Sequence, residues 1–211
     1  LSSTSGLCSL WKVLIASATG KSALKLREAL GKDIEIINVT HHMGFSGLNE
    51  SDISEDMIDA CRKNFELNQK EINLINADIL HWSTPETFDL VVTNPPYFCG
   101  TPAKHGAHHN VDISQWMKRC VERAKPNGHF CTIIDTPLLG ITLSILNDKH
   151  LGDIKIFPLF GSKDTAERVL ISARKSVRTG STLYKGSSMN NESILRSGMT
   201  INELLDAIEE Q

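Results

Sequence analysis

The sequence predicts a single α/β domain built on a doubly wound, mostly parallel sheet with helices on both faces. Short apolar segments of strand length alternate with segments whose apolar residues recur at helical spacing, a pattern typical of right-handed β-α-β units. The last two strand-like segments follow each other without a helix, which predicts an antiparallel strand pair at one end of the sheet. A length of 211 residues suits one such domain.

Seven apolar segments predict the strands, and their residue ranges are 12–17, 34–39, 72–80, 88–94, 129–135, 154–160 and 168–175. Helices are predicted from apolar stripes and end signals: Gly31 ends the first helix, Ser54 caps the second, and a Pro-Asn-Gly turn follows the third. The expected helices cover residues 20–31, 54–68, 112–125, 138–148 and 200–211. Ligands of doubly wound sheets bind at the carboxyl ends of strands, where the chain forms turns at residues 16–22, 76–80 and 93–98.

Composition narrows the classes of function and the compartment. With a formal net charge of -3, the chain does not attract nucleic acid through its overall electrostatic field, so any contact with nucleic acid has to be local. The five cysteines are widely spaced and contain no CxxC pair, which favours reduced thiols and a cytoplasmic location. We expect no signal peptide and no membrane helix, because no apolar run approaches the roughly 20 residues that a membrane span needs.

Histidines gather at residues 41–42 and 105–109, with Cys99 nearby. Their spacing lacks the tight ligand pairs of zinc sites, so we expect loop histidines near a substrate or a phosphate and no metal. Whether the chain is a monomer or a homodimer does not follow from the sequence.

The segment 88–98, FDLVVTNPPYF, is the one that indicates chemistry most strongly. Two prolines at a strand end fix φ and stop the ladder, so they stiffen a turn that presents Asn94 and Tyr97 at the sheet rim. The Asn94 side-chain oxygen and a proline carbonyl can accept both hydrogens of an exocyclic amine, while Tyr97 or Phe98 stacks on the attached base. The alternative is a rigid turn with a stacked aromatic ring and no ligand.

With its Asn-Pro-Pro-Tyr motif after the fourth strand, the chain resembles class I S-adenosylmethionine-dependent methyltransferases of the N6-adenine and amino-nitrogen group. Residues 51–178 are most similar to bacterial enzymes that methylate N6 of an adenosine beside a tRNA anticodon. The resemblance implies a Rossmann-like fold and a catalytic pocket at Asn94, Pro95, Pro96 and Tyr97. The resemblance also implies a cofactor site formed by Ala16, Ser17, Gly20, Asp52, Ala77, Asp78 and Asn94. The substrate site that it implies is formed by Tyr97, Phe98 and Arg168.

The first turn departs from that family, because it has one glycine where the family has a glycine-rich turn, and no acid. Residues 12–47 instead resemble a small α/β domain related to the C-terminal domain of pyruvate kinase, some members of which bind a sugar phosphate. In this alternative a phosphate is held by Ser17, Thr19, Gly20, Lys21 and Ser22. A Walker A motif is excluded, because it needs glycine where the chain has Ile15.

Two resemblances in one chain suggest a chimera within a single domain. Its parts are a pyruvate-kinase-like first half over residues 1–50, a methyltransferase-like part over 51–178, and a tail with a helix over 179–211. The favoured function is S-adenosylmethionine-dependent methylation of adenine N6 in RNA, with tRNA as the substrate. The alternatives are a chimeric domain with weak or no catalysis, and a domain that binds a small phosphorylated metabolite.

A basic stretch at residues 163–185 has a local charge balance of +4, because six of its side chains are basic and two are acidic. These are Lys163, Arg168, Arg174, Lys175, Arg178 and Lys185, against Asp164 and Glu167. The stretch is suited to contact RNA phosphates, and a solvated face is the equal alternative.

Overall fold

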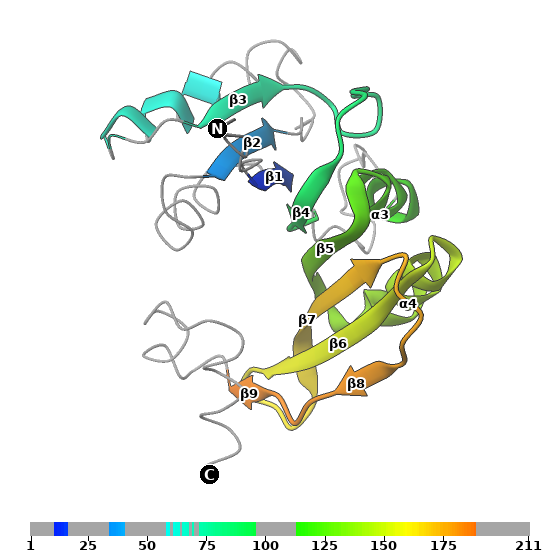
Figure 1. Cartoon of the computed structure of the whole chain (residues 1–211). Coiled ribbons are helices and arrows are strands. Elements are labelled where there is room, and N and C mark those ends of the chain that lie inside the picture. The colour runs from blue at the N-terminus through cyan, green and yellow to red at the C-terminus, as the bar shows by residue number, and fades with distance from the viewer. Residues whose placement is uncertain are drawn as a thin grey trace, which may run out of the picture.

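A computed structural model describes residues 11–16, 34–40, 72–95 and 113–188, together with residues 58–59, 61–63, 65–67 and 69. The described strands form one nine-stranded sheet in the order β3-β2-β1-β4-β5-β7-β6-β8, with β9 paired to β6 (Figure 1). The strands are β1 (Trp11–Ala16), β2 (Ile34–Thr40), β3 (Asn73–Asn76), β4 (Phe88–Thr93), β5 (Ala124–Asp135), β6 (Leu151–Phe160), β7 (Ala166–Lys175), β8 (Ser181–Leu183) and β9 (Ser187–Ser188). The described helices are α3 (Ile113–Glu122) and α4 (Leu139–Asp148), the latter preceded by a 3-10 turn, η1 (Thr136–Leu138).

The strand directions confirm the predicted fold class. Strands β3, β2, β1, β4 and β5 run parallel to one another, while β7 is antiparallel to both β5 and β6. The expected antiparallel pair is therefore β6 and β7, with β7 inserted between β5 and β6. The sheet twists steadily from β3 to β8 in Figure 1, as parallel sheets of this size do.

Alternate residues of the central strands face two apolar clusters, which is the period of 2 that a strand imposes. One cluster joins Leu14 and Val91 to the buried faces of α3 and α4. The other joins Val13 to Cys61 and Phe65, which lie in the helical residues 58–59, 61–63 and 65–67 on the opposite face. The sheet is thus covered on both faces, as a doubly wound fold requires.

Two elements differ from the sequence prediction around the central strands. The strand expected over residues 72–80 ends at Asn76, because Asp78 begins a hydrogen-bonded turn. The helix expected to end at residue 125 ends at Glu122, and the Pro-Asn-Gly residues lie inside β5. They form an irregularity where the β4–β5 register shifts: Asn127 has a φ of 64°, and a Cβ on Gly128 would lie 3.0 Å from the Phe88 carbonyl oxygen.

Strands β8 and β9 lie where the sequence predicted only a tail. After β7 the chain crosses the start of β6 so closely that a Cβ on Gly152 would lie 2.2 Å from the Val177 carbonyl oxygen. It then pairs with β6 in two short pieces on either side of Pro158, which has no N–H to donate. Gly186, with a φ of 84°, passes over the Pro158 carbonyl at the break. The helices expected over residues 20–31 and 200–211 lie outside the described residues.

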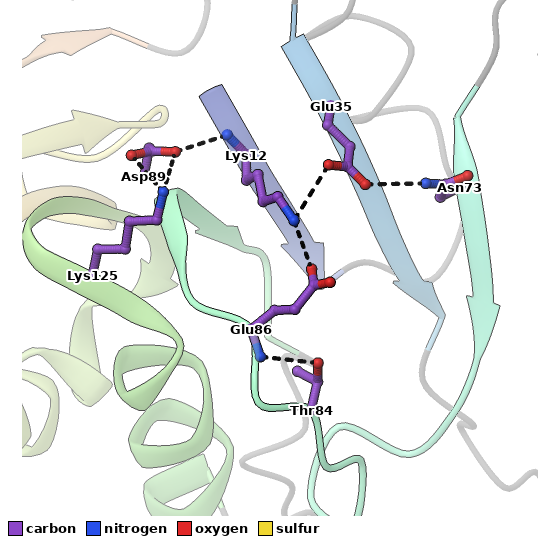
Figure 2. Close-up of polar contacts among 7 residues, drawn as sticks. All are labelled: Lys12, Glu35, Asn73, Thr84, Glu86, Asp89 and Lys125. Atoms are coloured by element: carbon purple, nitrogen blue, oxygen red, sulfur yellow. Dashed lines mark hydrogen bonds and ion pairs between the residues drawn. The ribbon is translucent and has the colours of Figure 1, made fainter. Parts of the chain in front are cut away.

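Polar side chains join the strands at their amino ends, the edge of the sheet away from the predicted site (Figure 2). The Lys12 ammonium group contacts Glu86 at 3.2 Å and Glu35 at 3.6 Å, and both carboxylates raise the pKa of Lys12, with the Glu86 hydrogen bond as the larger cause. The Asp89 carboxylate accepts from the Lys12 backbone N–H at 2.8 Å and from the Lys125 ammonium group at 2.9 and 3.0 Å. These contacts fix the start of β1 between β2 and β4.

Candidate active site

The carboxyl ends of β1, β3 and β4 form the edge of the sheet that carries the predicted site. Ala16 ends β1, pairs with Val39 of β2 and Thr93 of β4, and is fully buried. Strands β3 and β4 are separated by β2 and β1, so their ends lie about 14 Å apart at the usual strand spacing. An elongated ligand lying along this edge would therefore touch both ends.

Asn94 is presented to solvent directly after β4. Its backbone N–H donates to the Ala16 carbonyl at 3.4 Å, which is a long continuation of the β1–β4 pairing. Thr93 before it and Pro95 after it are buried, whereas Asn94 is exposed. The strand end thus places one exposed amide side chain between two buried residues, whereas the Tyr97 that the sequence prediction puts beside it lies outside the described residues.

Asp78 organises the turn after β3. Its carboxylate accepts from the Leu80 N–H at 2.9 Å and contacts His81 Nδ1 at 2.6 Å, and its carbonyl accepts from the N–H groups of His81 and Trp82. Arg123 donates to the Trp82 carbonyl at 3.3 Å, with its guanidinium group 5.7 Å from the indole ring centroid. The Asp78 side chain stays 30% exposed, and a carboxylate has lone pairs for further donors.

Arg168 lies on β7 at the same edge of the sheet. It pairs in register with Asp135, the last residue of β5, and its Nε lies 3.6 Å from Asp135 Oδ1. Extending the β4–β5 register by one residue puts Arg168 about 10 Å to the side of Asn94 and about 7 Å further along the strands. Close by, the Thr136 hydroxyl donates to the Ala166 carbonyl at 2.6 Å and ties the end of β5 to the start of β7.

The structure brings together part of the predicted site. Ala16, Ala77, Asp78, Asn94, Pro95 and Arg168 all lie at the carboxyl edge of β1, β3, β4 and β5. The remaining predicted residues lie outside the described part of the chain and stay predictions: Ser17, Thr19, Gly20, Lys21, Ser22, Asp52, Pro96, Tyr97 and Phe98.

The basic stretch does not form one surface. Arg168 is near one end of β7, whereas Arg174 and Lys175 are at the other end, roughly 20 Å away at the rise of a strand. Lys175 donates to the carbonyl oxygens of Val121 and Glu122 at the end of α3, and burial lowers its pKa. Only the part of the stretch near Arg168 is placed to meet a ligand at the predicted site.

Sequence reasoning missed the buried polar contact beneath Asn94. Trp116 of α3 donates its indole N–H to the Thr93 hydroxyl at 2.8 Å, and both side chains are 1% exposed. The signal was present: Thr93 is the one hydroxyl residue in an otherwise apolar strand end, directly before the motif. Asp135 was also missed, although it ends a predicted strand at the ligand-binding edge.

The residues that the structure describes contain neither a metal-ligand cluster nor a membrane-spanning helix. Their His, Cys, Asp and Glu side chains form no group of three or more that could hold a metal ion. None of the described helices is both long and apolar enough to cross a bilayer.

Solved structures of methyltransferases share this fold. The crystal structure of Atu636 from Agrobacterium tumefaciens, a predicted O-methyltransferase, superposes with a TM-score of 0.65 at 16% identity and covers 89% of both chains. The N-methyltransferase NodS from Bradyrhizobium japonicum, solved with S-adenosyl-L-homocysteine, superposes with a TM-score of 0.56 at 15% identity, covering 80% of this chain and 79% of NodS. Both likenesses establish the Rossmann-like fold.

Curated relatives match over a shorter segment. A tRNA1(Val) (adenine(37)-N6)-methyltransferase from Bacteroides thetaiotaomicron is 28% identical over 87 residues, which is 38% of this chain and 37% of that protein. The enzyme of the same name from Glaesserella parasuis serovar 5 is 30% identical over 69 residues, which is 30% of this chain and 29% of that protein. The aligned segment thus spans well under half the length of each relative.

The family assignment rests on the central part of the chain. The sequence model of the methyltransferase small domain matches residues 37–149, from within β2 to the end of α4, which is more than half of the 211 residues. The match includes residues 37–50, which the chimera hypothesis assigns to the pyruvate-kinase-like first half. It does not cover β1 and the first turn, so a separate origin of these residues stays a hypothesis. The chain belongs to the methyltransferase small domain family.

Proposed function

We propose that this chain is an S-adenosylmethionine-dependent methyltransferase that methylates N6 of an adenine in tRNA. The observation that carries the proposal is the exposed Asn94 at the end of β4, set between two buried residues on the ligand-binding edge of the sheet. The family match and the names of the two curated relatives support the same activity and the same substrate class. With tRNA as its substrate, the protein would act in the cytoplasm.

Asn94 supplies what methyl transfer to an adenine amine needs. The N6 nitrogen is a poor nucleophile because its lone pair is conjugated with the ring. When Asn94 Oδ1 and the Pro95 carbonyl accept the two amine hydrogens, they hold the nitrogen in one orientation and favour attack along one line. The nitrogen would form its bond to the methyl carbon as the methyl–sulfur bond breaks and S-adenosylhomocysteine is released. The surplus proton would then leave to solvent, so no strong general base is required.

The described residues fit S-adenosylmethionine, which when bound supplies an electrophilic methyl group. The Asp78 side chain is 30% exposed just after the end of β3, so its carboxylate and the Ala77 backbone are suited to the adenine end. Ala16 ends β1, which lies between β3 and β4 in the sheet, and its carbonyl accepts the Asn94 N–H, so it supports the middle of this edge. Asp78 and the backbone of Asn94, at the ends of β3 and β4, would contact opposite ends of this elongated cofactor, so the Asn94 side chain stays available for the target amine.

Arg168 is suited to the substrate side of the pocket. It lies beyond Asn94 on the side away from Asp78, and its side chain is 43% exposed. A guanidinium group at this place can bind a phosphate of the RNA backbone, which contributes affinity that decreases with salt. Pro96, Tyr97 and Phe98 complete the pocket in this proposal, with an aromatic ring stacked on the target base.

Methyl transfer to unmodified tRNA transcripts tests the proposal. We expect the purified chain to convert adenosine to N6-methyladenosine, detected by mass spectrometry of digested RNA, and to bind S-adenosylmethionine in calorimetry. Asn94→Ala should lower kcat about 100-fold, because the amine loses its orientation, and change the cofactor Kd by less than about threefold. Asn73→Ala is the matched control, because Asn73 is an exposed asparagine at the opposite end of the parallel strands that bonds Glu35 at 3.4 Å.

The outcomes separate the alternatives. Absence of cofactor binding at millimolar concentration would reject the methyltransferase, and binding of inorganic phosphate in the same calorimetry would favour the phosphorylated-metabolite domain instead. Cofactor binding without transfer to any transcript would point to a catalytically inert chimera. If Asn94→Ala kept the wild-type kcat, the Asn-Pro-Pro-Tyr motif would have no role in orienting the target amine.

A further inference from the structure

A buried side-chain hydrogen bond lies directly beneath Asn94. The Thr93 hydroxyl accepts from Trp116 Nε1 at 2.8 Å, and the two side chains are each 1% exposed. Thr93 is the last residue of β4, and Trp116 lies one turn into α3. A bond of this length between two buried groups is well formed, and it is shielded from competing water.

This bond joins the two elements on either side of the motif. The chain leaves β4 at Thr93 and enters α3 at Ile113, so the contact links the residue before Asn94 to the helix that follows the motif. The backbone ladder weakens at the same point, because the N–H of Asn94 lies 3.4 Å from the Ala16 carbonyl. The Thr93 side chain therefore adds a restraint where the backbone restraint fades.

The neighbouring strand contains a natural comparison. Thr132 of β5 pairs in register with Thr93, is 3% exposed, and has a hydroxyl without a hydrogen-bond partner. Two threonines side by side in the same sheet, equally buried, thus differ in whether their hydroxyl is used. Burial alone does not require the bond at position 93.

We propose that Thr93 and Trp116 are positioning residues, whose hydrogen bond fixes the end of β4 so that the Asn94 amide is held in the orientation for the target amine. The inference rests on the proposed function for its catalytic consequence. Its structural content, a restrained backbone at Asn94, is independent of that function.

Four variants test the proposal. Thr93→Val keeps the shape and removes the acceptor, Thr93→Ser keeps the hydroxyl, Trp116→Phe removes the donor, and Thr132→Val makes the same change where no bond exists. We expect Thr93→Val and Trp116→Phe to lower kcat about 10-fold or more with little change in the cofactor Kd, since a small misplacement of a reacting group is costly. Thr93→Ser should keep most of the wild-type kcat, and Thr132→Val should keep all of it.

The double variant Thr93→Val/Trp116→Phe identifies the bond itself. If the two residues act through one contact, the double variant should lose no more kcat than the worse single variant. Multiplicative losses, a wild-type kcat in Thr93→Val, or an equal loss in Thr132→Val would each overturn the proposal. If Thr93→Val and Thr132→Val lower the Tm equally, a loss of stability cannot explain a lower kcat in Thr93→Val alone, and the difference in kcat decides the test.

Hydrogen exchange gives a readout that does not depend on activity. In Thr93→Val the backbone amide of Asn94 should exchange at least about 10-fold faster than in wild type, and in Thr132→Val it should not. If wild type transfers no methyl group but exchange at Asn94 responds in this way, the proposed function fails and the positioning contact stands. Unchanged exchange in Thr93→Val overturns the contact whether or not the chain is active.

Discussion

Replacing Asp89 with alanine should destabilise the fold without changing the site. Asp89 lies near the start of β4, five residues before Asn94 and so about 17 Å from it along the strand. Its carboxylate accepts from the Lys12 backbone N–H at 2.8 Å and from Lys125 Nζ at 2.9 and 3.0 Å (Figure 2). The substitution therefore removes contacts that hold β1 and β5 to β4.

The size of the loss follows from these contacts. A hydrogen bond from a backbone N–H to a carboxylate contributes about 1.5–3 kcal/mol. The Lys125 ion pair, with its partners 36% and 26% exposed, adds at most about 1 kcal/mol. We expect Asp89→Ala to lower the free energy of unfolding by about 2–3 kcal/mol, which corresponds to a fall in Tm of roughly 5–10 °C for a domain of this size. Asp89→Asn keeps an acceptor for Lys12 and should lose about half as much.

Urea denaturation at several pH values is the assay. Burial by itself would raise the pKa of Asp89, but the Lys12 N–H and the Lys125 ammonium group outweigh it, so the folded-state pKa is lowered. The stabilisation is therefore complete above the ordinary aspartate pKa of about 4 and is lost as pH falls through the lower folded-state value. The difference between wild type and Asp89→Ala should be constant near pH 7 and shrink below about pH 4.

Glu86→Gln is the control, because Glu86 is 43% exposed in its pair with Lys12 and should contribute less than about 0.5 kcal/mol. Equal losses in Asp89→Ala and Glu86→Gln would refute the reasoning, as would a loss in Asp89→Ala that does not depend on pH. Both variants should keep the wild-type kcat for methyl transfer at 25 °C.

Two further predictions concern backbone space and thiol chemistry. Gly152→Ala should lower the free energy of unfolding by about 1–3 kcal/mol, because the new Cβ would lie 2.2 Å from the Val177 carbonyl oxygen. Gly140→Ala in α4 should raise the free energy of unfolding by up to about 1 kcal/mol, because nothing lies within 4 Å of the new Cβ. Thermal unfolding measures both variants, and shifts of the same sign would contradict the prediction. Burial raises the pKa of Cys120 to about 12, so its peptide should stay unlabelled by iodoacetamide in the native protein at pH 8 and become labelled in denaturant, as measured by mass spectrometry; labelling in the native protein would contradict this.

The arrangement of the sheet could be predicted because it depends on patterns that are local in sequence. Alternation of strands and helices fixed the parallel core, and the absence of a helix between residues 160 and 168 predicted the antiparallel pair of β6 and β7. Strand ends were predicted less well where a side chain competes with the ladder. Asp78 stops β3 by accepting the Leu80 N–H, and a bulge at Asn127 and Gly128 lets β5 begin before the expected turn has ended.

Strands β8 and β9 could not be predicted from their own residues. The segment is polar, and it pairs only because the chain passes tightly over Gly152 and finds the free edge of β6. These contacts join residues 25 to 28 positions apart, and no local propensity encodes them. The split of the basic stretch has the same origin, because the ten residues of β7 carry Arg168 and Lys175 to opposite ends of a strand.

The candidate site shows which part of a function a sequence can reveal. The motif identifies Asn94, because a polar residue between a buried strand and two prolines has little structural reason to be there. It does not identify what holds Asn94 in place, because Trp116 is 23 residues away from Thr93 and on its own is an ordinary core residue of an amphipathic helix. Only the fold shows that the indole N–H meets the hydroxyl under the motif. Residues that touch a substrate are therefore visible in the sequence as local exceptions, whereas the residues that orient them become visible only as pairs in space.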